Sequence, residues 1–381
     1  MNIAYNTLSE NPLSGSGSLD FFIEMAKYIP QNDNKNNYYF IVSKLGKANF
    51  QNVNTLIGGY SNERKIARII SEQILLPIKL SRNKIDLLFT TSSGGIAPLL
   101  TPKGIKIILG VFATQHLKSN LLDLKRRLYR NILLKNSLKS ANIIVVNSNI
   151  CKADVLNTNI VTEEKIRVIP HGIDFECFHS KSTTKYEEKY FQNYQLHRPY
   201  ILFVSSLYPY KNVHTLVEAF GRFLIANKTN HELVLIGNYN CDKNYNNYMN
   251  SVYSIANKYN IKNRIRYLGK IPKDKLRVFY KKAEIYVQPS FYETFGKTTL
   301  EAMACGCPVI GSNTSATPEV LGNCGLLFDP YDVNDLKIKI ETMISDQLLK
   351  NKFVNNGLVR AQNYSLFHEA QNYVSIFNDV N

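Results

Sequence analysis

Residues 285–310 read IYVQPSFYETFGKTTLEAMACGCPVI, and this stretch decides the fold. An apolar run over Glu284–Gln288 predicts a strand, and a helical pattern follows over Thr298–Ala304. A second apolar run, Pro308–Gly311, predicts another strand. Strand, helix and strand joined by short loops are typical of two parallel strands with their crossover helix. The stretch therefore predicts part of a parallel sheet with a loop at the carboxyl end of its first strand.

The same alternation continues on both sides of this stretch. Strands are predicted at Asn2–Asn6, Tyr38–Ser43, Leu87–Thr90, Ile105–Val111, Ile143–Asn147, Tyr200–Ser205, Glu232–Ile236 and Arg264–Leu268. Helices are predicted at Leu19–Tyr28, Ala67–Leu80, Leu121–Ser140, Val213–Ala226, Lys273–Lys281 and Val333–Ile344. Continuous apolar strands separated by helices indicate parallel sheets that are covered on both faces. We therefore predict an α/β protein with two Rossmann-like, doubly wound domains that face a central cleft.

The length of the chain supports two domains. Its 381 residues exceed the size at which a single hydrophobic core stops growing, about 250–300 residues. The regular alternation lapses near residues 170–198, in a polar stretch that begins SKSTTK at Ser180. We accordingly predict an N-terminal domain over residues 1–178 and a second domain that begins at residue 179.

The composition narrows the class of protein. Apolar residues make up 44% of the chain, which is enough for sizeable cores. The formal net charge of +16 favours anionic partners, either nucleotide phosphates, acidic lipid or nucleic acid. No run approaches the roughly 18 apolar residues that a membrane-spanning helix needs. Residues 1–6 lack the pattern of a signal peptide, so we expect a cytoplasmic protein.

Three loops carry candidate phosphate sites. The first, Ser14-Gly-Ser-Gly-Ser18, lies between the first predicted strand and helix, where Gly15 and Gly17 would allow close approach to a phosphate. An ordinary flexible turn explains this loop equally well. The second loop, Ser205–Asn212, places Lys211 just before a helix, where its charge can meet a diphosphate. The alternative for Lys211 is a solvated surface lysine.

The third loop lies between the strand predicted at Glu284–Gln288 and the helix predicted at Thr298–Ala304. Backbone N–H groups of residues 296–298 would form an anion site at the start of the predicted helix. Glu293 precedes this helix and Glu301 lies within it, so the two carboxylates can address different parts of one extended ligand. Glu301 is placed to bind ribose hydroxyls, as acidic residues do in many nucleotide sites. The alternative is a capping acid followed by a solvated helix residue.

These motifs resemble the family 4 glycosyltransferases of the GT-B fold. The resemblance is carried by Glu293-x7-Glu301 followed by Ala-Met-Ala-x-Gly-x-Pro-Val-Ile310, and by segments in the same order along the chain. Those segments are IPHGID at residues 169–174, the Lys211 loop, PEV at 318–320 and GLLFDP at 325–330. The resemblance covers nearly the whole chain but is thin in the N-terminal half. It also implies that the second domain ends at residue 362 and that residues 363–381 form a helix crossing back to the first domain.

The resemblance implies a role for each candidate residue. Lys211 would bind the diphosphate, Glu293 the hydroxyls of the transferred sugar, and Glu301 the ribose. The nucleotide-sugar site would further include Gly15, Gly17, Ser206, Ile271, Phe295, Gly296, Lys297 and Thr298. The family pattern implies a retaining mechanism without a metal ion, and the chain carries no Asp-x-Asp motif of the kind that holds a cation in other transferases. No cofactor is expected besides the donor substrate.

Two positions depart from the family pattern. Many relatives have Gly-Arg where this chain has Ser205-Ser206. One cation that would contact the donor phosphates is therefore absent, and Lys211 would have to neutralise more of their charge. Many also have a His-Asp pair after the fourth strand of the first domain. His116 is the nearest candidate for this acceptor-side catalytic histidine, and a polar packing residue is the alternative.

One further segment suggests a lipid partner. Leu117–Lys139 is basic and amphipathic, with leucines near helical spacing and several arginines and lysines. It predicts docking on an anionic membrane surface, so the protein would be peripheral on the inner face of the plasma membrane. An ordinary surface helix with a solvated basic face is the alternative.

The sequence thus predicts transfer of a hexose from GDP-mannose or a UDP-sugar to a glycan or a polyprenyl-linked glycan. The local pattern looks most like mannosyl- and rhamnosyltransferases of bacterial surface polysaccharides. A sugar-nucleotide epimerase on the same fold remains an alternative. A basic nucleic-acid-binding protein is the alternative from another class, but no compact nucleic-acid-binding motif supports it, and we expect no nucleic-acid partner.

Overall fold

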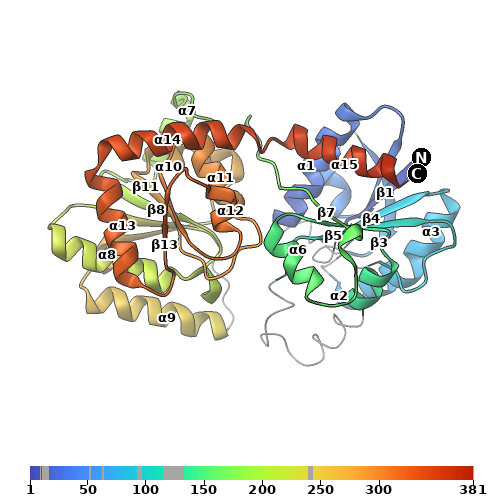
Figure 1. Cartoon of the computed structure of the whole chain (residues 1–381), viewed down its shortest axis with the longest axis horizontal. Coiled ribbons are helices and arrows are strands. Elements are labelled where there is room, and N and C mark those ends of the chain that lie inside the picture. The colour runs from blue at the N-terminus through green and yellow to red at the C-terminus, as the bar shows by residue number, and fades with distance from the viewer. Residues whose placement is uncertain are drawn as a thin grey trace. The chain divides into compact units, whose positions relative to one another are not determined.

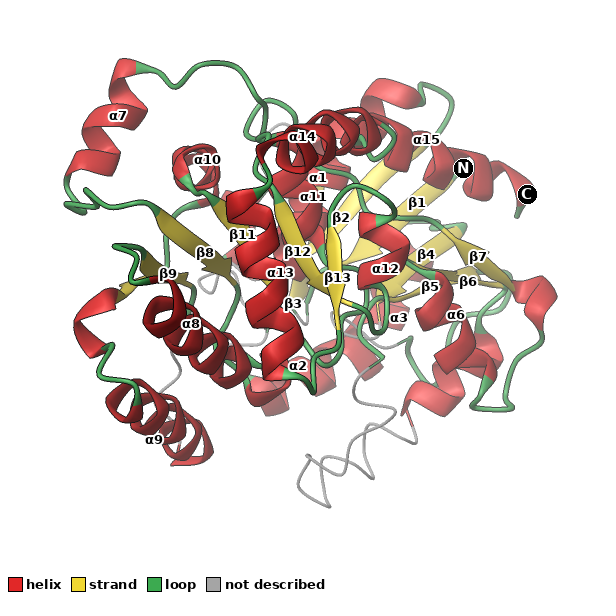
Figure 2. Cartoon of the chain, turned by 60° about the vertical axis from the view of Figure 1, so that its left-hand side comes forward, coloured by secondary structure: helices red, strands yellow, loops and turns green. Residues whose placement is uncertain are grey.

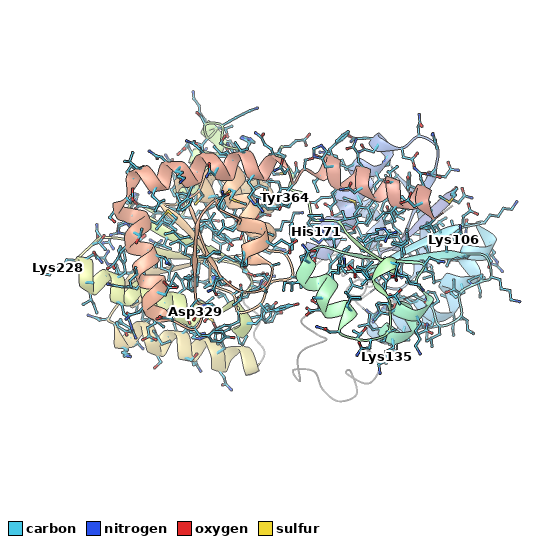
Figure 3. All side chains as sticks on the ribbon, viewed as in Figure 1. Lys106, Lys135, His171, Lys228, Asp329 and Tyr364 are labelled. Carbon is cyan, nitrogen blue, oxygen red and sulfur yellow. The ribbon has the colours of Figure 1, made fainter. Side chains whose placement is uncertain are left out.

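The computed structural model describes residues 1–8, 10, 17–50, 53–61, 64–91, 97–114, 133–238 and 243–380. The chain forms two compact units: residues 1–171 with 366–381, and residues 172–365. The prediction from the sequence had placed the changes between domains at 178 and 362. In each unit a parallel sheet is covered by helices, and side chains fill the space between sheet and helices (Figure 3).

The first unit contains a parallel sheet that has seven strands within the described residues. Its strand order, β3-β2-β1-β4-β5-β6-β7, is that of a doubly wound sheet (Figure 1). The strands are β1 (Asn2–Asn6), β2 (Asn37–Ser43), β3 (Asn54–Gly59), β4 (Leu87–Thr91), β5 (Lys106–Val111), β6 (Ile143–Val146) and β7 (Ile166–Val168). Its helices in the described part of the chain include α1 (Gly17–Asn32), α2 (Lys65–Ile70), the π-helical η2 (Ser71–Leu75), α3 (Leu76–Arg82), α6 (Asn149–Leu156) and α15 (Leu366–Asp379).

The two faces of the first sheet are covered by different helices. Alternate residues of β1 point to opposite faces, so Tyr5 joins the core beneath α1 and α15 while Ala4 joins the core beneath α3. The last helix, α15, packs against α1, and its Tyr373 and Phe377 enter the same core as Tyr5. The C-terminal segment therefore completes the core of the first unit, although it follows the second unit in sequence.

The second unit repeats the scheme with six strands among the described residues, in the order β10-β9-β8-β11-β12-β13. The strands are β8 (Tyr200–Val204), β9 (Glu232–Ile236), β10 (Ile265–Gly269), β11 (Ile285–Gln288), β12 (Val309–Ser312) and β13 (Leu326–Phe328). The helices are α7 (Lys185–Gln192), α8 (Val213–Asn227), α9 (Lys243–Lys258), α10 (Lys273–Lys282), α11 (Lys297–Ala304), α12 (Thr317–Leu321), α13 (Val333–Ser345) and α14 (Gln347–Gln362). Figure 2 shows these helices on both faces of the sheet.

The helix ends of the second unit follow local sequence signals. Thr184 and Glu187 form a capping box at the start of α7, and Asp332 caps α13 by accepting two backbone N–H groups. Every residue of β8, β9 and β11 is buried, as a central strand between two helical layers requires. The prediction of two Rossmann-like domains with parallel sheets is therefore confirmed. In the described part of the chain, no helix combines the length and apolar character needed to cross a bilayer.

Candidate functional site

The strand order of the second sheet defines where a ligand is expected. The neighbouring strands β8 and β11 lie where the winding of the chain reverses, since β8 leads to β9 on one side and β11 to β12 on the other. Open α/β sheets bind ligands at the carboxyl ends of the strands at such a switch point. The loops that leave these two ends are residues 205–212 and 289–296, and both were predicted to carry the chemistry.

Lys211 and Glu293 meet at this switch point. The Lys211 Nζ lies 2.6 Å from the Glu293 Oε1, and the two side chains expose only 13% and 9% of their surface. Burial on its own lowers the pKa of Lys211, but the nearby Glu293 carboxylate outweighs it and holds this pKa above its ordinary value. Lys211 is therefore a permanent cation at neutral pH. It joins its own loop to the loop of Glu293, a residue 82 positions later in the sequence.

Local backbone geometry fixes Lys211 at the end of its loop. Pro209–Lys211 form a short 3-10 turn, and Asn212 follows in the left-handed conformation with φ of 58°. The Asn212 side-chain amide donates to the carbonyl oxygens of Pro289 and Pro330, at 3.0 and 2.9 Å. These bonds tie the Lys211 loop to the loop that carries Glu293, so the ion pair is held from both sides.

Glu293 is held by several donors on a single oxygen. Its Oε1 accepts from Lys211, from the Ser290 hydroxyl at 2.8 Å and from the Gln288 side-chain amide. Its backbone N–H donates to the Ser315 hydroxyl at 2.8 Å. Because the donors converge on Oε1, the orientation of the carboxylate is fixed by its surroundings.

Gln288, the last residue of β11, connects this carboxylate to the start of α11. Its side-chain oxygen accepts from the Tyr286 hydroxyl and from the Thr298 hydroxyl, the latter at 3.1 Å, while its amide donates to Glu293. The Tyr286 hydroxyl also lies 2.7 Å from the Thr298 hydroxyl. The amide nitrogen of Gln288 therefore faces Glu293 and the Ser290 hydroxyl, to which it donates at 3.2 Å, because its oxygen is occupied on the other side.

The start of α11 lies beside this network. Gly296 precedes the helix with φ of 91°, a conformation that favours glycine, and it makes no side-chain cap. In this eight-residue helix no side chain of the capping residue accepts from the first turn, where the Thr299 N–H donates to the Gly296 carbonyl at 2.9 Å. A helix start of this kind, next to Lys211, provides a positive environment for a phosphate.

Glu301 lies one turn further along α11. It is 7% exposed, and its Oε2 accepts from the Tyr280 hydroxyl at 3.0 Å. Burial and then the nearby Glu301 carboxylate raise the pKa of Tyr280 well above its ordinary value, so this hydroxyl remains a donor. Tyr280 thus positions one oxygen of the carboxylate that we predict to bind ribose.

The other predicted residues of the second unit lie in several settings. Ser206 follows the end of β8. A Cβ added to Gly237 would lie 1.8 Å from the Ser205 carbonyl oxygen, so the loops that follow β8 and β9 pack backbone to backbone. The Gly237 N–H donates to the Gly269 carbonyl, which brings the loop of Ile271 to the same edge of the sheet. The side chains of Ile271 and Phe295 are 5% and 3% exposed and belong to the core, so only their backbones are candidates for ligand contact. Lys297 is the first residue of α11.

Several predicted residues of the first unit cannot be placed. Gly17 is the first residue of α1, but Gly15 and His116 lie outside the described residues. The same is true of most of Leu117–Lys139, of which only residues 133–139 are described, in a helix that extends to residue 140. The roles of these residues therefore stay predictions. Among the residues that are described, no three His, Cys, Asp or Glu side chains are grouped in a way that could hold a metal ion.

Reasoning from the sequence missed Gln288, Ser290, Tyr280 and Ser315. Gln288 carried one signal, because it is a polar residue at the end of an otherwise apolar strand whose carboxyl end faces the site. The other three hydroxyl-bearing residues have no distinguishing spacing in the sequence. They reach the site because strand pairing and loop geometry bring them there.

Solved structures with the same arrangement of elements include glycosyltransferases. Sucrose-phosphate synthase from Thermosynechococcus elongatus has a TM-score of 0.79 at 18% identity, with 100% of this chain and 99% of that chain covered. Anabaena HepE in complex with UDP and glucose has a TM-score of 0.75 at 18% identity, with both chains covered completely. Together with the site at the switch point, these likenesses define the fold class as GT-B.

The sequence comparisons identify the two domains. Residues 32–176 match Glycosyltransferase Family 4, and residues 186–360 match Glycosyl transferases group 1. The chain is therefore built from a Family 4 glycosyltransferase domain followed by a group 1 glycosyl transferase domain. A similar curated protein is the O-antigen chain mannosyltransferase B of Escherichia coli, which is 34% identical over 176 residues. That match covers 46% of this chain and 44% of the relative, so the chain spans less than half the length of that relative.

Proposed function

We propose that this protein is a glycosyltransferase that moves a hexose from a nucleotide-diphosphate sugar to a glycan or a lipid-linked glycan. The observation that carries the proposal is the buried pair of Lys211 and Glu293 at the switch point of the second sheet. Beside this pair lie the start of α11, which has no side-chain cap from Gly296, and the carboxylate of Glu301. A cation, a set of N–H groups and two carboxylates match the diphosphate, sugar and ribose of one extended donor.

In the proposed reaction, the bond between the sugar C1 and the diphosphate oxygen breaks while a bond from C1 to the acceptor oxygen forms. Negative charge grows on the leaving diphosphate, and Lys211 and the N–H groups of α11 stabilise that charge. Glu293 holds hydroxyls of the transferred sugar. The acceptor hydroxyl loses its proton to the departing phosphate on the same face of the sugar, which gives retention of configuration. Because the protein supplies the cationic groups, we propose that the reaction needs no metal ion.

The donor and the acceptor are proposed from the relatives. The mannosyltransferase name of the Escherichia coli relative supports GDP-mannose, and the UDP and glucose bound to Anabaena HepE support a UDP-sugar. The O-antigen named for the relative supports a bacterial surface polysaccharide as the product, built on a polyprenyl-linked acceptor. We keep a cytoplasmic location, peripheral at the membrane, as part of the proposal.

The proposal is tested by release of nucleoside diphosphate from a panel that includes GDP-mannose and UDP-glucose, with and without a chelator and an acceptor glycan. We expect one donor to give acceptor-dependent release that the chelator does not abolish. Conversion of the sugar in the absence of acceptor would identify an epimerase instead. Loss of release with the chelator would contradict metal independence, and an absence of release from every donor would contradict the transferase.

A further inference from the structure

A row of exposed isoleucines runs along α2, η2 and α3 in the first unit. Ile66, Ile70, Ile74 and Ile78 recur every four residues and expose 78%, 49%, 56% and 45% of their surface. Contiguous apolar surface of this kind on a folded protein marks a site that binds a partner or a membrane. None of these side chains belongs to the site described above, which lies in the other unit.

The π-helical segment keeps the row straight. In an α-helix four residues advance about 40° beyond one full turn, so a row with this spacing drifts around the axis. The wider turn at Ser71–Leu75 reduces that advance. Leu76 and Leu80 are fully buried on the opposite side, and the Tyr60 N–H donates to the Ser71 hydroxyl at 3.0 Å. The helix is therefore anchored to the sheet by one face and presents the isoleucines on another.

The apolar surface extends to a neighbouring loop. Leu99 and Leu100 expose 49% and 81% of their surface, and the Leu99 N–H donates to the Gln73 side-chain oxygen at 2.8 Å. This bond fixes the two leucines beside η2. The exposed apolar side chains thus come from two separate segments that share one surface.

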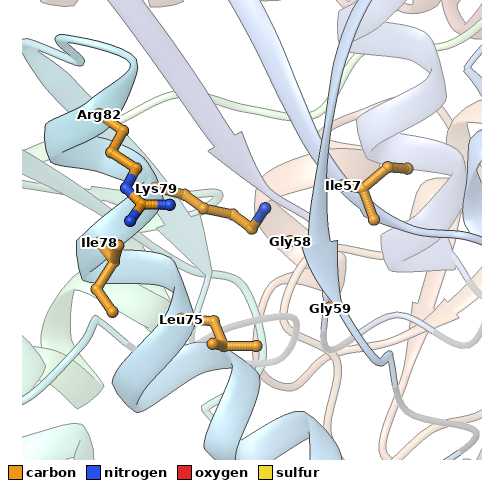
Figure 4. Close-up of a pocket in the computed structure, with 7 residues that line it drawn as sticks. All are labelled: Ile57, Gly58, Gly59, Leu75, Ile78, Lys79 and Arg82. Carbon is orange, nitrogen blue, oxygen red and sulfur yellow. The ribbon is translucent and has the colours of Figure 1, made fainter.

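A pocket of about 370 Å³ adjoins the row, between α3 and the edge strand β3. Its lining has Ile57, Gly58 and Gly59 on one side and Leu75 and Ile78 on the other. Lys79 and Arg82 complete the lining, and Lys79 extends from α3 toward Gly58 (Figure 4). Within the described part of the chain, neither cation forms an ion pair with a carboxylate, so both are available to an anion.

The charge around the row is mostly positive. Residues 64–84 contain six lysines and arginines and one acid, Glu72. Glu72 is 3% exposed and lies 3.6 Å from Arg68, so it pairs with that arginine and leaves the other cations without a counter-charge from it. At the start of α2, Arg64 lies over the exposed ring of Tyr60, 5.1 Å from its centroid. Apolar side chains flanked by cations and an interfacial tyrosine are typical of a helix that lies in a membrane interface.

We propose that this surface docks on a bilayer that contains anionic phospholipid. The isoleucine row enters the interface, and a lipid phosphate binds Lys79 and Arg82 in the pocket. A second copy of the chain fits less well, because a symmetric contact would bring the same cations together from both subunits. The inference assigns a surface to the peripheral membrane location that is part of the proposed function, and it is independent of the sugar chemistry and of Leu117–Lys139.

The experiment is flotation of the full-length chain with vesicles of phosphatidylcholine, with and without phosphatidylglycerol. We expect binding only when phosphatidylglycerol is present. Lys79→Gln with Arg82→Gln should weaken binding about tenfold or more, since each cation near an anionic surface contributes about fivefold. Ile70→Ser with Ile74→Ser should weaken it by at least about tenfold through lost apolar burial. All four positions are at the surface, so the variants should fold.

Matched controls come from the second unit. Ile225 and Ile338 are 62% and 52% exposed, and Lys262 and Lys352 are exposed cations. Ile225→Ser with Ile338→Ser, and Lys262→Gln with Lys352→Gln, should leave vesicle binding unchanged. Equal binding to neutral and anionic vesicles would overturn the proposal. So would full binding by the α2–α3 variants, or a change in their oligomeric mass without a change in vesicle binding.

Discussion

The Lys211 ammonium and the Glu293 carboxylate form a 2.6 Å ion pair between the two loops that leave the switch point of the second sheet. In the absence of ligand, Glu293 is the anion that neutralises this buried cation. A bound diphosphate would bring a second anion to the same lysine. The pair therefore links the affinity for the donor to the charge on Glu293.

The first prediction concerns that charge. Glu293→Gln keeps the shape of the side chain but leaves Lys211 without its anion, so nucleoside diphosphate should bind at least as tightly as in the wild type. The rate of sugar transfer should fall at least about tenfold, since a contact to the sugar is lost. Calorimetry with nucleoside diphosphate and steady-state kinetics separate the two effects. Weaker diphosphate binding with an unchanged kcat would show that Glu293 does not have this role.

The second prediction concerns Glu301. A carboxylate that accepts two ribose hydroxyls should contribute a few kcal/mol, because hydrogen bonds to charged groups contribute about 1.5–3 kcal/mol each. Glu301→Ala should raise the nucleotide Kd at least about tenfold without unfolding the second unit. Tyr280→Phe should have a smaller effect, because it removes only the bond that orients the carboxylate. Unchanged nucleotide affinity in a folded Glu301→Ala variant would rule out the ribose contact.

The third prediction concerns Gln288, which acts through Glu293. Gln288→Leu should lower kcat about 10- to 100-fold, because small misplacements of a reacting group cost rates of this order. The Kd for nucleoside diphosphate should change little, since Gln288 does not address the phosphates. Tyr286→Phe loosens the same amide from its other side and should give an intermediate kcat. Equal losses in kcat and in diphosphate affinity would indicate a general structural defect.

The fourth prediction concerns pH and stability. Burial, with Arg68 opposing it, raises the pKa of Glu72 to about 7 from an ordinary value of 4.5. Between these values the unfolded chain has released its proton while the folded chain keeps it, so the folded state loses stability as the pH rises. Glu72→Gln removes this cost and should stabilise the protein by roughly 2–3 kcal/mol at pH 8 but little at pH 4.

Urea unfolding at the two pH values measures this difference. Glu163 is the matched control, because its side chain is 66% exposed, and Glu163→Gln should give no pH-dependent gain. An equal effect of Glu72→Gln at both pH values would show that the pKa of Glu72 is the same in the folded and the unfolded chain.

The sequence predicted the strands and helices that carry strong apolar periodicity. β1 and β9 have the predicted bounds, and β11 begins one residue later than predicted. The missed strands β3, β7 and β13 are short or lie at sheet edges, where side chains are only partly buried and the apolar signal is weak. α9 was missed for a similar reason, since its sequence, KNYNNYMNSVYSIANK, is dominated by polar residues.

The site could be predicted only where residue type and position carry a signal. Each residue could be identified separately, because Lys211 and Glu293 lie in loops that follow predicted strands and Glu301 lies in the predicted helix after the second of these loops. That Lys211 and Glu293 touch could not be read from the sequence, because it depends on the pairing of β8 with β11. The same holds for Tyr280, which lies on α10 and reaches Glu301 only through the packing of α10 on α11.

The most direct test of the account is the kcat of Lys211→Ala with the donor that the nucleotide-sugar panel identifies. The contact strengthens as charge grows on the leaving diphosphate, so kcat should fall about 10²- to 10³-fold. Lys211→Arg should recover part of the rate, and Lys262→Ala, an exposed lysine of the same unit, should leave it unchanged. A folded Lys211→Ala enzyme with the kcat of the wild type would contradict the claim that Lys211 stabilises the departing diphosphate.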